Sequence, residues 1–278
     1  MQTWKQKTAR HTALIVLTVI MLYPVLWMIS SSLKESSQVF VDAHSLLPHP
    51  FVFSNYVDGW KGFGGVSFST FFQNSFLIVI IATVGGVLCS TAIAYGFARV
   101  RFRGKQIWFT CMLLSMMLPF EIIMIPQYIL FNWFGMVNTY LPLILPTFFG
   151  VPFFVFLIMQ FIRTIPYEID EAATIDGCNR FSLFVRIIVP LVLPAMMTSA
   201  IFSFYWRWDD FMGPLIYLST PQKYPVALAL RMFADPNTVT NWGALFAMST
   251  ASLLPVLIVF FIFQKYIVEG ISTSGLKA

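Results

Sequence analysis

The sequence predicts an all-α membrane protein with six transmembrane helices. Hydrophobic residues make up 58% of the chain, charged residues make up only 10%, and the mean hydropathy is +0.77. Water-soluble domains are about one quarter charged, so a soluble globular enzyme is excluded as the default class. The apolar runs are unbroken and do not alternate, which favours helices over the strands of a β-barrel.

The first predicted span covers residues 12–30, which carry no charge and follow a basic head of Lys5, Lys7 and Arg10. A cleavable signal peptide has a similar head, but its apolar core is usually about 7 to 15 residues long. We therefore expect this run to be retained as a helix. Five further runs are long enough to cross a bilayer, and the whole chain, 1–278, is expected to form a single transmembrane domain. They cover residues 72–98, 107–130, 141–162, 191–218 and 242–264.

The distribution of lysine and arginine predicts that both termini lie in the cytoplasm. Six spans place both ends on one side, and the positive-inside rule assigns the side richer in basic residues to the cytoplasm. The richer side holds Lys5, Lys7, Arg10, Arg99, Arg101, Arg103, Lys105, Arg163, Arg180, Arg186, Lys265 and Lys277, against Lys34, Lys61, Lys223 and Arg231 on the other. Because these residues are scattered beside apolar runs, the net charge of +5 does not indicate nucleic-acid binding.

On the opposite side, the connections 31–71 and 219–241 are long enough to contact a partner protein. Long connections are also often loose, and the sequence leaves both readings open.

The connection between residues 164 and 190 carries the main functional signal. Pro166 can take the first position of a helix, and the helix N-terminus favours the negative charges of Glu168, Asp170 and Glu171 that follow. Gly177 is suited to the left-handed conformation that ends a helix. An apolar and small stripe is expected opposite the acidic face, formed by Ile165, Ile169, Ala172 and Ala173.

A second short helix is expected after this turn and is predicted to stop at Pro190. Its apolar stripe comprises Phe181, Phe184, Val185 and Ile188, with Arg180 and Arg186 off the stripe. On periodicity alone, the two helices equally fit an ordinary amphipathic loop at the membrane surface.

The order of residues in this connection is more specific than its periodicity. Glu171-Ala172-Ala173, then Asp176-Gly177, then Phe184, Ile187, Pro190 and Pro194 closely resemble the EAA loop of permease subunits in binding-protein-dependent ABC importers. In that family the loop is a coupling helix, which docks in a groove of the cytoplasmic ATPase. The resemblance implies that Glu171 pairs with a basic group of the ATPase, that Ala172 and Ala173 allow close approach, and that Gly177 makes the turn next to Asp176. Cys178 stands where the family most often has alanine.

The resemblance extends along nearly the whole chain and narrows to the second six-span permease of maltose-, alginate- and glycerol-phosphate-type importers. It is carried by YPVLWMISSSLK (23–34), AYGFARVRFRGK (94–105), LPFEIIMIPQYILF (118–131), NTYLPLILP (138–146), QFIRTIPYEIDEAATIDG (160–177) and FQKYIVEGISTSGLKA (263–278). It implies a type I ABC importer permease fold and a cytoplasmic (inner) membrane location. The implied partners are a second permease subunit, two ATPase subunits that bind ATP and Mg²⁺, and an extracytoplasmic solute-binding protein.

In that branch the C-terminal tail reaches between the ATPases. Gly275 and Lys277, with Gly270, are therefore candidates for a second contact, and a frayed tail is the alternative.

Ionisable residues within spans are costly and need an explanation. Trp208-Asp209-Asp210-Phe211 resembles the Trp-Asn-Asp-Phe that the family often has in its fifth span, with Asp209 in place of asparagine. Arg207 and Asp210 are three residues apart, so a structural ion pair on one helix face is one interpretation.

The other interpretation of the same residues is a substrate pathway. Tyr205, Trp206 and Trp208 supply flat apolar faces beside the fork-shaped cation of Arg207, a combination suited to an anionic oligosaccharide such as one that contains uronate. Glu121, between Pro119 and Pro126, is predicted either to line the same pathway or to cap a broken helix.

The motif search favours a translocation subunit over an enzyme. No GxxxxGK[ST], GxSxG, HExxH or CxxC pattern occurs in the sequence, and neither cysteine nor histidine spacing indicates a metal site or a cofactor held by this chain. An ion-coupled secondary transporter or channel is the stronger rival, since prolines and intramembrane carboxylates occur there as well. No internal repeat typical of such transporters is evident.

Overall fold

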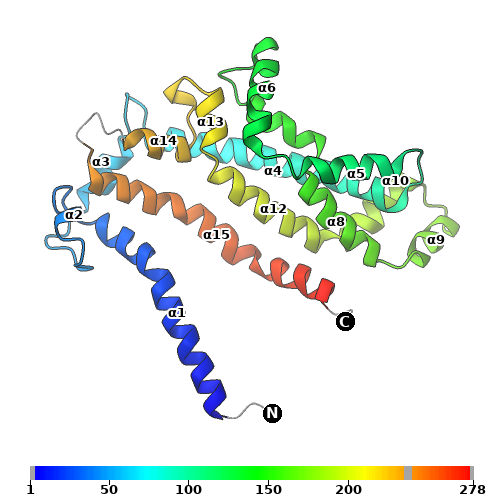
Figure 1. Cartoon of the computed structure of the whole chain (residues 1–278), viewed down its shortest axis with the longest axis horizontal. Coiled ribbons are helices and arrows are strands. Elements are labelled where there is room, and N and C mark those ends of the chain that lie inside the picture. Colours follow the sequence, from blue (N-terminus) through cyan, green and yellow to red (C-terminus); the bar gives the residue numbers. More distant parts are fainter. Residues whose placement is uncertain (1–3, 235–239, 276–278) are drawn as a thin grey trace. The chain divides into compact units, whose positions relative to one another are not determined.

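The computed structural model describes residues 4–234 and 240–275. Within these residues the chain is helical and has no β-strand, with one isolated bridge between Phe63 and Val66. Four helices are long and apolar enough to cross a membrane, or six if each of two bent helix pairs forms one span. The predicted all-α class is confirmed (Figure 1).

The helices are bounded as follows. The first half of the chain contains α1 (Trp4–Ser31), α2 (Gln38–Val41), α3 (Ser54–Trp60), α4 (Phe68–Arg99), α5 (Lys105–Ser115), α6 (Phe120–Trp133), α7 (Leu141–Ile144) and the 3₁₀ helix η1 (Leu145–Phe149). The second half contains α8 (Pro152–Thr164), α9 (Glu168–Ile175), α10 (Arg180–Leu183), the π-helical η2 (Phe184–Ile188), α11 (Val189–Leu191), α12 (Leu193–Trp208), α13 (Met212–Tyr217), η3 (Pro221–Lys223), α14 (Val226–Phe233) and α15 (Trp242–Gly275).

The chain divides into two compact units, residues 1–69 with 229–254 and residues 70–228 with 255–278. In the first unit, the connection between α1 and α4 is folded. The buried Lys34 Nζ donates to the carbonyl oxygens of Asp42 and Ser45, each at 2.7 Å, and Asn55 Nδ2 donates to those of Ser32 and Lys34 at 2.9 and 2.8 Å. These bonds tie α2 and α3 to the end of α1, so the loose alternative for this connection is wrong.

The core of the second unit lies among α4, α8 and α12. Phe154, Ile158 and Ile162 of α8 are almost completely buried and pack with Ala94 of α4 and Ala195 of α12. The 3₁₀ helix η1 crosses α4 closely. A Cβ atom on Gly85 would lie 2.3 Å from the end of the Phe148 ring, so a larger residue at this position would need that exposed ring to move.

Two of the predicted spans are broken. The run predicted at 107–130 forms α5 and α6, whose axes differ by 103° across residues 116–119. The run predicted at 191–218 is not one helix, because α12 ends at Trp208 and the six-residue α13 begins at Met212. A helix segment that starts at Arg180 precedes α12 with a bend of 72°. Proline accounts for several of these starts, since Pro119 precedes α6 and Pro194 lies in the first turn of α12.

Two buried serines of α4 cap other segments of the second unit. Ser90 Oγ accepts a hydrogen bond from the Val151 N–H at 2.9 Å, directly before α8, and Ser75 Oγ accepts one from the Val226 N–H at 2.8 Å, at the start of α14. The first N–H groups of a helix have no partner within the helix, so these hydroxyls satisfy donors that are otherwise buried unpaired.

Asn55→Ala is expected to destabilise the folded connection of the first unit. The substitution removes two hydrogen bonds and leaves the carbonyl oxygens of Ser32 and Lys34 unpaired, at a cost of about 1–3 kcal/mol. Thermal inactivation and limited proteolysis of the detergent-solubilised protein measure this effect. Lys61→Ala is the control, because its ion pair with Asp58 is solvent-exposed. Equal proteolysis of the two variants would contradict the structural role of Asn55.

Candidate functional site

Helix α9 is a short, separately capped helix that follows α8. It begins at Glu168, two residues later than the position of Pro166 predicts, and Glu168, Asp170 and Glu171 occupy its first turn. It ends in a Schellman motif, in which the N–H groups of Gly177 and Cys178 donate to the carbonyl oxygens of Thr174 and Ala173 at 3.1 and 2.9 Å. Gly177 has φ = 84°, which confirms the left-handed turn predicted for it.

The surface of α9 differs from the predicted stripe. Ala173 is buried, whereas Ala172 is exposed together with Glu171, Ile175 and Asp176. Asp170 was expected on the exposed acidic face, but it lies on the buried side with Ala173, three residues further along the helix. That prediction was wrong because Asp170 meets a cation from a distant part of the chain.

The cation is Arg99, the last residue of α4. Its Nη2 donates to the Ile165 carbonyl oxygen at 2.7 Å, its Nε lies 3.0 Å from Asp170 Oδ2, and its guanidinium carbon lies 5.2 Å from the centre of the Tyr167 ring. The side chains of Arg99 and Asp170 are 9% and 8% exposed. Arg99, Ile165, Tyr167 and Asp170 are called the Arg99 cluster below.

The electrostatics of this cluster are those of a buried ion pair that is incompletely hydrogen-bonded. Burial raises the pKa of Asp170 above its ordinary value, and the Arg99 guanidinium opposes this shift. Among the described residues, neither Arg99 Nε nor Asp170 Oδ1 has a hydrogen-bond partner of good geometry. The pair is therefore held by charge and by the Ile165 and Tyr167 contacts more than by a paired fork.

A hollow of about 760 Å³ adjoins α9. It is lined by Arg99, Asp170 and Glu171, by Ile175 at the end of α9, and by Arg180 and Leu183 of α10. The side of α9 that faces the protein is thus only partly packed.

The segment after α9 does not follow the predicted α-helical stripe. Residues 184–188 form a π turn, and the helix continues past Pro190 to Leu191. Of the predicted stripe, Ile188 is buried and Phe184 packs against the core, whereas Phe181 is 74% exposed and Val185 is 43% exposed. Because a π turn contains more residues per turn, Leu183 takes a buried position on the same side as Ile188.

The charged residues predicted for the fifth span lie at the break between α12 and α13. Asp210 Oδ1 accepts a hydrogen bond from the Gly213 N–H at 3.0 Å, so it caps the start of α13. Arg207 and Asp210 are not on one helix, because α12 ends at Trp208. Among the residues that the structure describes, no ion pair within 4.0 Å includes Arg207.

Arg207 and Asp210 both line a hollow of about 10 Å³, with Ser75 and Val79 of α4 and Pro214 of α13. This volume holds about one water molecule and is far below the several hundred Å³ of a typical ligand pocket. The structure therefore brings the two charged residues together around a closed space.

The aromatic residues beside Arg207 have different environments. Trp208 is 6% exposed and stacks on Phe204, with ring centres 5.5 Å apart. Trp206 is 47% exposed and stacks on Phe154 at 5.6 Å. Tyr205 is 52% exposed and Asp209 is exposed. Of the three rings predicted to contact a sugar, Trp208 is a packed core residue in this conformation.

The remaining predicted site residues lie elsewhere. Glu121 is exposed in the first turn of α6, whose start has no side-chain cap hydrogen bond, and it does not line the hollow at Arg207. Gly275 is the last residue of α15, and Lys277 lies outside the described residues.

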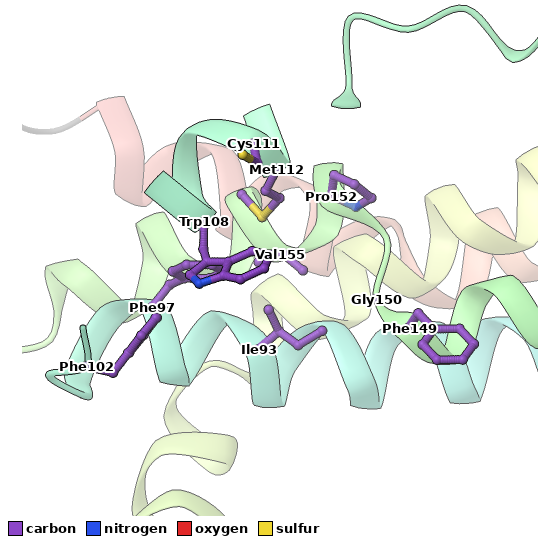
Figure 2. Close-up of a pocket in the computed structure, with 10 residues that line it drawn as sticks. All are labelled: Ile93, Phe97, Phe102, Trp108, Cys111, Met112, Phe149, Gly150, Pro152 and Val155. Atoms are coloured by element: carbon purple, nitrogen blue, oxygen red, sulfur yellow. The ribbon is translucent and has the colours of Figure 1, made fainter. Parts of the chain in front are cut away.

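A further hollow of about 480 Å³ is apolar (Figure 2). It is bordered by Ile93 and Phe97 of α4, Trp108 and Met112 of α5, and Val155 of α8. None of its lining residues carries a charge, so it does not match the polar groups of a sugar.

Among the described residues, no three of histidine, cysteine, aspartate or glutamate lie close enough to hold a metal ion.

Comparison with known proteins gives a family match over most of the chain. Residues 86–273 match the family described as "Binding-protein-dependent transport system inner membrane component". The arabinooligosaccharides transport system permease protein AraQ of Bacillus subtilis (strain 168) is 33% identical over 94% of this chain and 92% of its own length. The sulfoquinovosyl glycerol transport system permease protein SmoH of Agrobacterium fabrum is 29% identical over 98% of this chain and 94% of its own.

A solved structure also resembles this chain. It is described as a bacterial ABC transporter involved in the import of the acidic polysaccharide alginate, and one of its chains superposes with a TM-score of 0.78. The match covers 96% of this chain and 99% of that chain at 21% sequence identity, which establishes a common fold.

Gly177→Ala is expected to loosen the end of α9, whereas Gly96→Ala is not expected to destabilise α4. A Cβ atom would meet no heavy atom within 4 Å at either site, so the two substitutions differ mainly in the positive φ of Gly177. A non-glycine residue in that conformation costs about 1–2 kcal/mol. Hydrogen exchange of segment 168–178, followed by mass spectrometry, is expected to be faster in Gly177→Ala. Equal protection of this segment in both variants would count against the assigned turn.

Proposed function

Because the chain belongs to the family of binding-protein-dependent transport system inner membrane components, we propose that it is the permease subunit of an ATP-driven importer of a sugar or oligosaccharide. The observation that carries the proposal is α9, a capped helix whose exposed surface presents Glu171, Ala172 and Asp176. Such a helix is available to a partner because its outer side is not packed against the described chain. The names of the relatives AraQ and SmoH support a carbohydrate as the imported molecule.

The proposed assembly contains a second permease subunit as the other half of a heterodimeric pore, two ATPase subunits and an extracytoplasmic solute-binding protein. ATP and Mg²⁺ bind to the ATPase subunits, and this chain translocates the substrate without catalysing a reaction. Both termini and α9 lie on the cytoplasmic side, which the excess of basic residues supports. Gly275 and Lys277 are proposed as a second contact with the ATPases.

In this assembly α9 is the coupling helix. Glu171 is exposed and pairs with a basic group of the ATPase, while Ala172 and Asp176 border the contact and Gly177 makes the turn that ends it. Ala173 is buried against the rest of this chain. Its small side chain therefore allows close packing of α9 within the permease, and not against the ATPase. Closure of the ATPase pair on ATP moves α9, and the spans then reorient between outward-facing and inward-facing states.

The docking of α9 is tested by cross-linking and by coupled transport. In membranes that contain the full importer, Ile175→Cys, at a position that is 86% exposed, is expected to cross-link to the ATPase and to react with impermeant thiol reagents only from the cytoplasmic side. The native cysteines Cys89, Cys111 and Cys178 are first replaced. Deletion of residues 171–177 is expected to abolish transport-coupled ATP hydrolysis without preventing membrane insertion.

Val41→Cys is the matched control, because Val41 is similarly exposed and lies on the predicted outer side. Cross-linking of Val41→Cys but not Ile175→Cys to the ATPase would refute the assigned orientation. Uptake by this chain without an ATPase, driven by an ion gradient, would instead establish the rival secondary transporter or channel.

We further propose that the substrate is anionic and that Arg207 contributes to its pathway with Asp210, and with Tyr205 and Trp206 as exposed rings. Arg207 borders this hollow with Asp210 and forms no ion pair within 4.0 Å among the described residues, so a substrate that enters the space when it opens would meet both charges. The sulfoquinovosyl glycerol of the relative SmoH is an anionic glycoside, whereas the arabinooligosaccharides of AraQ are neutral.

Arg207→Ala is expected to lower the uptake of an anionic oligosaccharide about tenfold more than the uptake of a neutral one, because a hydrogen bond to a charged group contributes about 1.5–3 kcal/mol. Vesicle uptake of the two radiolabelled sugars measures the ratio. Arg207→Lys keeps the charge but not the planar fork, and it is expected to give an intermediate ratio. An equal loss for both sugars would mean that Arg207 has a structural role.

A further inference from the structure

Arg99 differs from the other basic residues of its connection. Arg99, Arg101, Arg103 and Lys105 are grouped at the end of α4, and topology alone would treat them as equivalent. Arg101 and Arg103 are exposed, and Lys105 Nζ donates to the Val100 carbonyl oxygen at 3.2 Å. Arg99 is nearly buried and makes all three contacts of the Arg99 cluster with the segment that leads into α9.

The charges of this cluster complement the two helix ends that meet there. Arg99 lies in the last turn of α4, where the helix dipole favours a cation, and Asp170 lies in the first turn of α9, where it favours an anion. Removal of one member of a buried ion pair leaves the other charge without compensation in a poorly solvated site. The attachment of α9 to α4 therefore depends strongly on both residues.

The other attachments of α9 are sparse. Asp170 and Ala173 are its buried residues, its inner side borders the hollow of about 760 Å³, and its C-terminal end runs into the turn at Gly177. Apolar packing of α9 is limited to Ala173, with Ile165 before the helix and Cys178 after it, at the edge of the core. A force applied to α9 is transmitted to the remainder of the chain chiefly where the Arg99 cluster holds it.

Helix α4 connects this cluster to the region of Arg207. It is unbroken from Phe68 to Arg99, and Ser75 and Val79 on the same helix line the small hollow with Arg207 and Asp210. Arg99 is 24 positions after Ser75, so at 1.5 Å per residue the two are separated by about 36 Å along the helix. A displacement of the last turn of α4 is thereby carried along one continuous helix to the wall of that hollow.

We infer that Arg99 is a positioning residue for coupling: with Asp170, it fixes α9 to the end of α4, so that movement of α9 displaces α4 and opens or closes the space at Arg207. This inference rests on the proposed docking of α9 to the ATPase. Arg99 itself contacts neither nucleotide nor substrate. Its effect is on the number of ATP molecules hydrolysed for each substrate imported.

The test compares Arg99→Gln, Asp170→Asn and the double variant in the complete importer, reconstituted in liposomes with its solute-binding protein. Each variant also carries Ile175→Cys, so that cross-linking of α9 to the ATPase is followed in the same sample. We expect the cross-link and the ATPase activity to persist, while the ratio of ATP hydrolysed to substrate imported rises about tenfold. The double variant is expected to be no worse than the worse single variant, because the two residues act as a unit.

Arg103→Gln is the matched control, since it removes an exposed cation from the same connection and is expected to leave the ratio unchanged. A normal ratio in Arg99→Gln and Asp170→Asn, with the cross-link retained, would overturn the inference and leave the docking proposal intact. Failure of the parent Ile175→Cys importer to cross-link would overturn the docking proposal itself. If Arg99→Gln does not reach the membrane, Asp170→Asn, which preserves side-chain size, decides the question by the same ratio.

Discussion

The bilayer offers no hydrogen bonds to a polypeptide backbone, and this constraint governs where the spans of the chain can break. Three helix starts in the second unit show local means of meeting this constraint. Asp210 accepts from the Gly213 N–H where α12 gives way to α13, and prolines, which have no N–H to satisfy, lie at the starts of α8 and α12. The interruption at Asp210 lies beside Arg207, so the site proposed for the substrate is also a place where the helical backbone is discontinuous.

The sequence predicts the helical class, most of the apolar runs and the turn at Gly177, because each depends on residues close together in the chain. A broken helix beside Glu121 is one of the two predicted alternatives, but the positions and angles of the bends are not predicted, since residues 116–119 and 209–211 lie within or beside runs whose average hydropathy is unaffected by a bend. The π turn at 184–188 changed the buried face of its segment for a related reason, because periodicity analysis assumes a constant number of residues per turn.

The contact between Arg99 and Asp170 in the Arg99 cluster is not predicted by the sequence, for a different reason. The positive-inside rule treats Arg99 as one of several topology signals, and the helix pattern places Asp170 on an exposed acidic face, as is typical of charged residues at a membrane surface. The two residues are 71 positions apart, and so distant a contact leaves no periodic pattern in the sequence. One signal was present: Asp170 is three residues before Ala173, which the predicted stripe places on the protein side, so the two side chains share a face of α9 and a carboxylate there needs a cation or hydrogen-bond donors nearby.

The serine caps on α4 have a consequence for how this helix can diverge among related proteins. Ser75 and Ser90 each hold the backbone of a segment more than sixty residues away, yet a more apolar residue at either position would make α4 look like a better membrane helix. Replacement of either serine by an apolar residue would therefore remove a contact inside the protein that the hydropathy of α4 does not record.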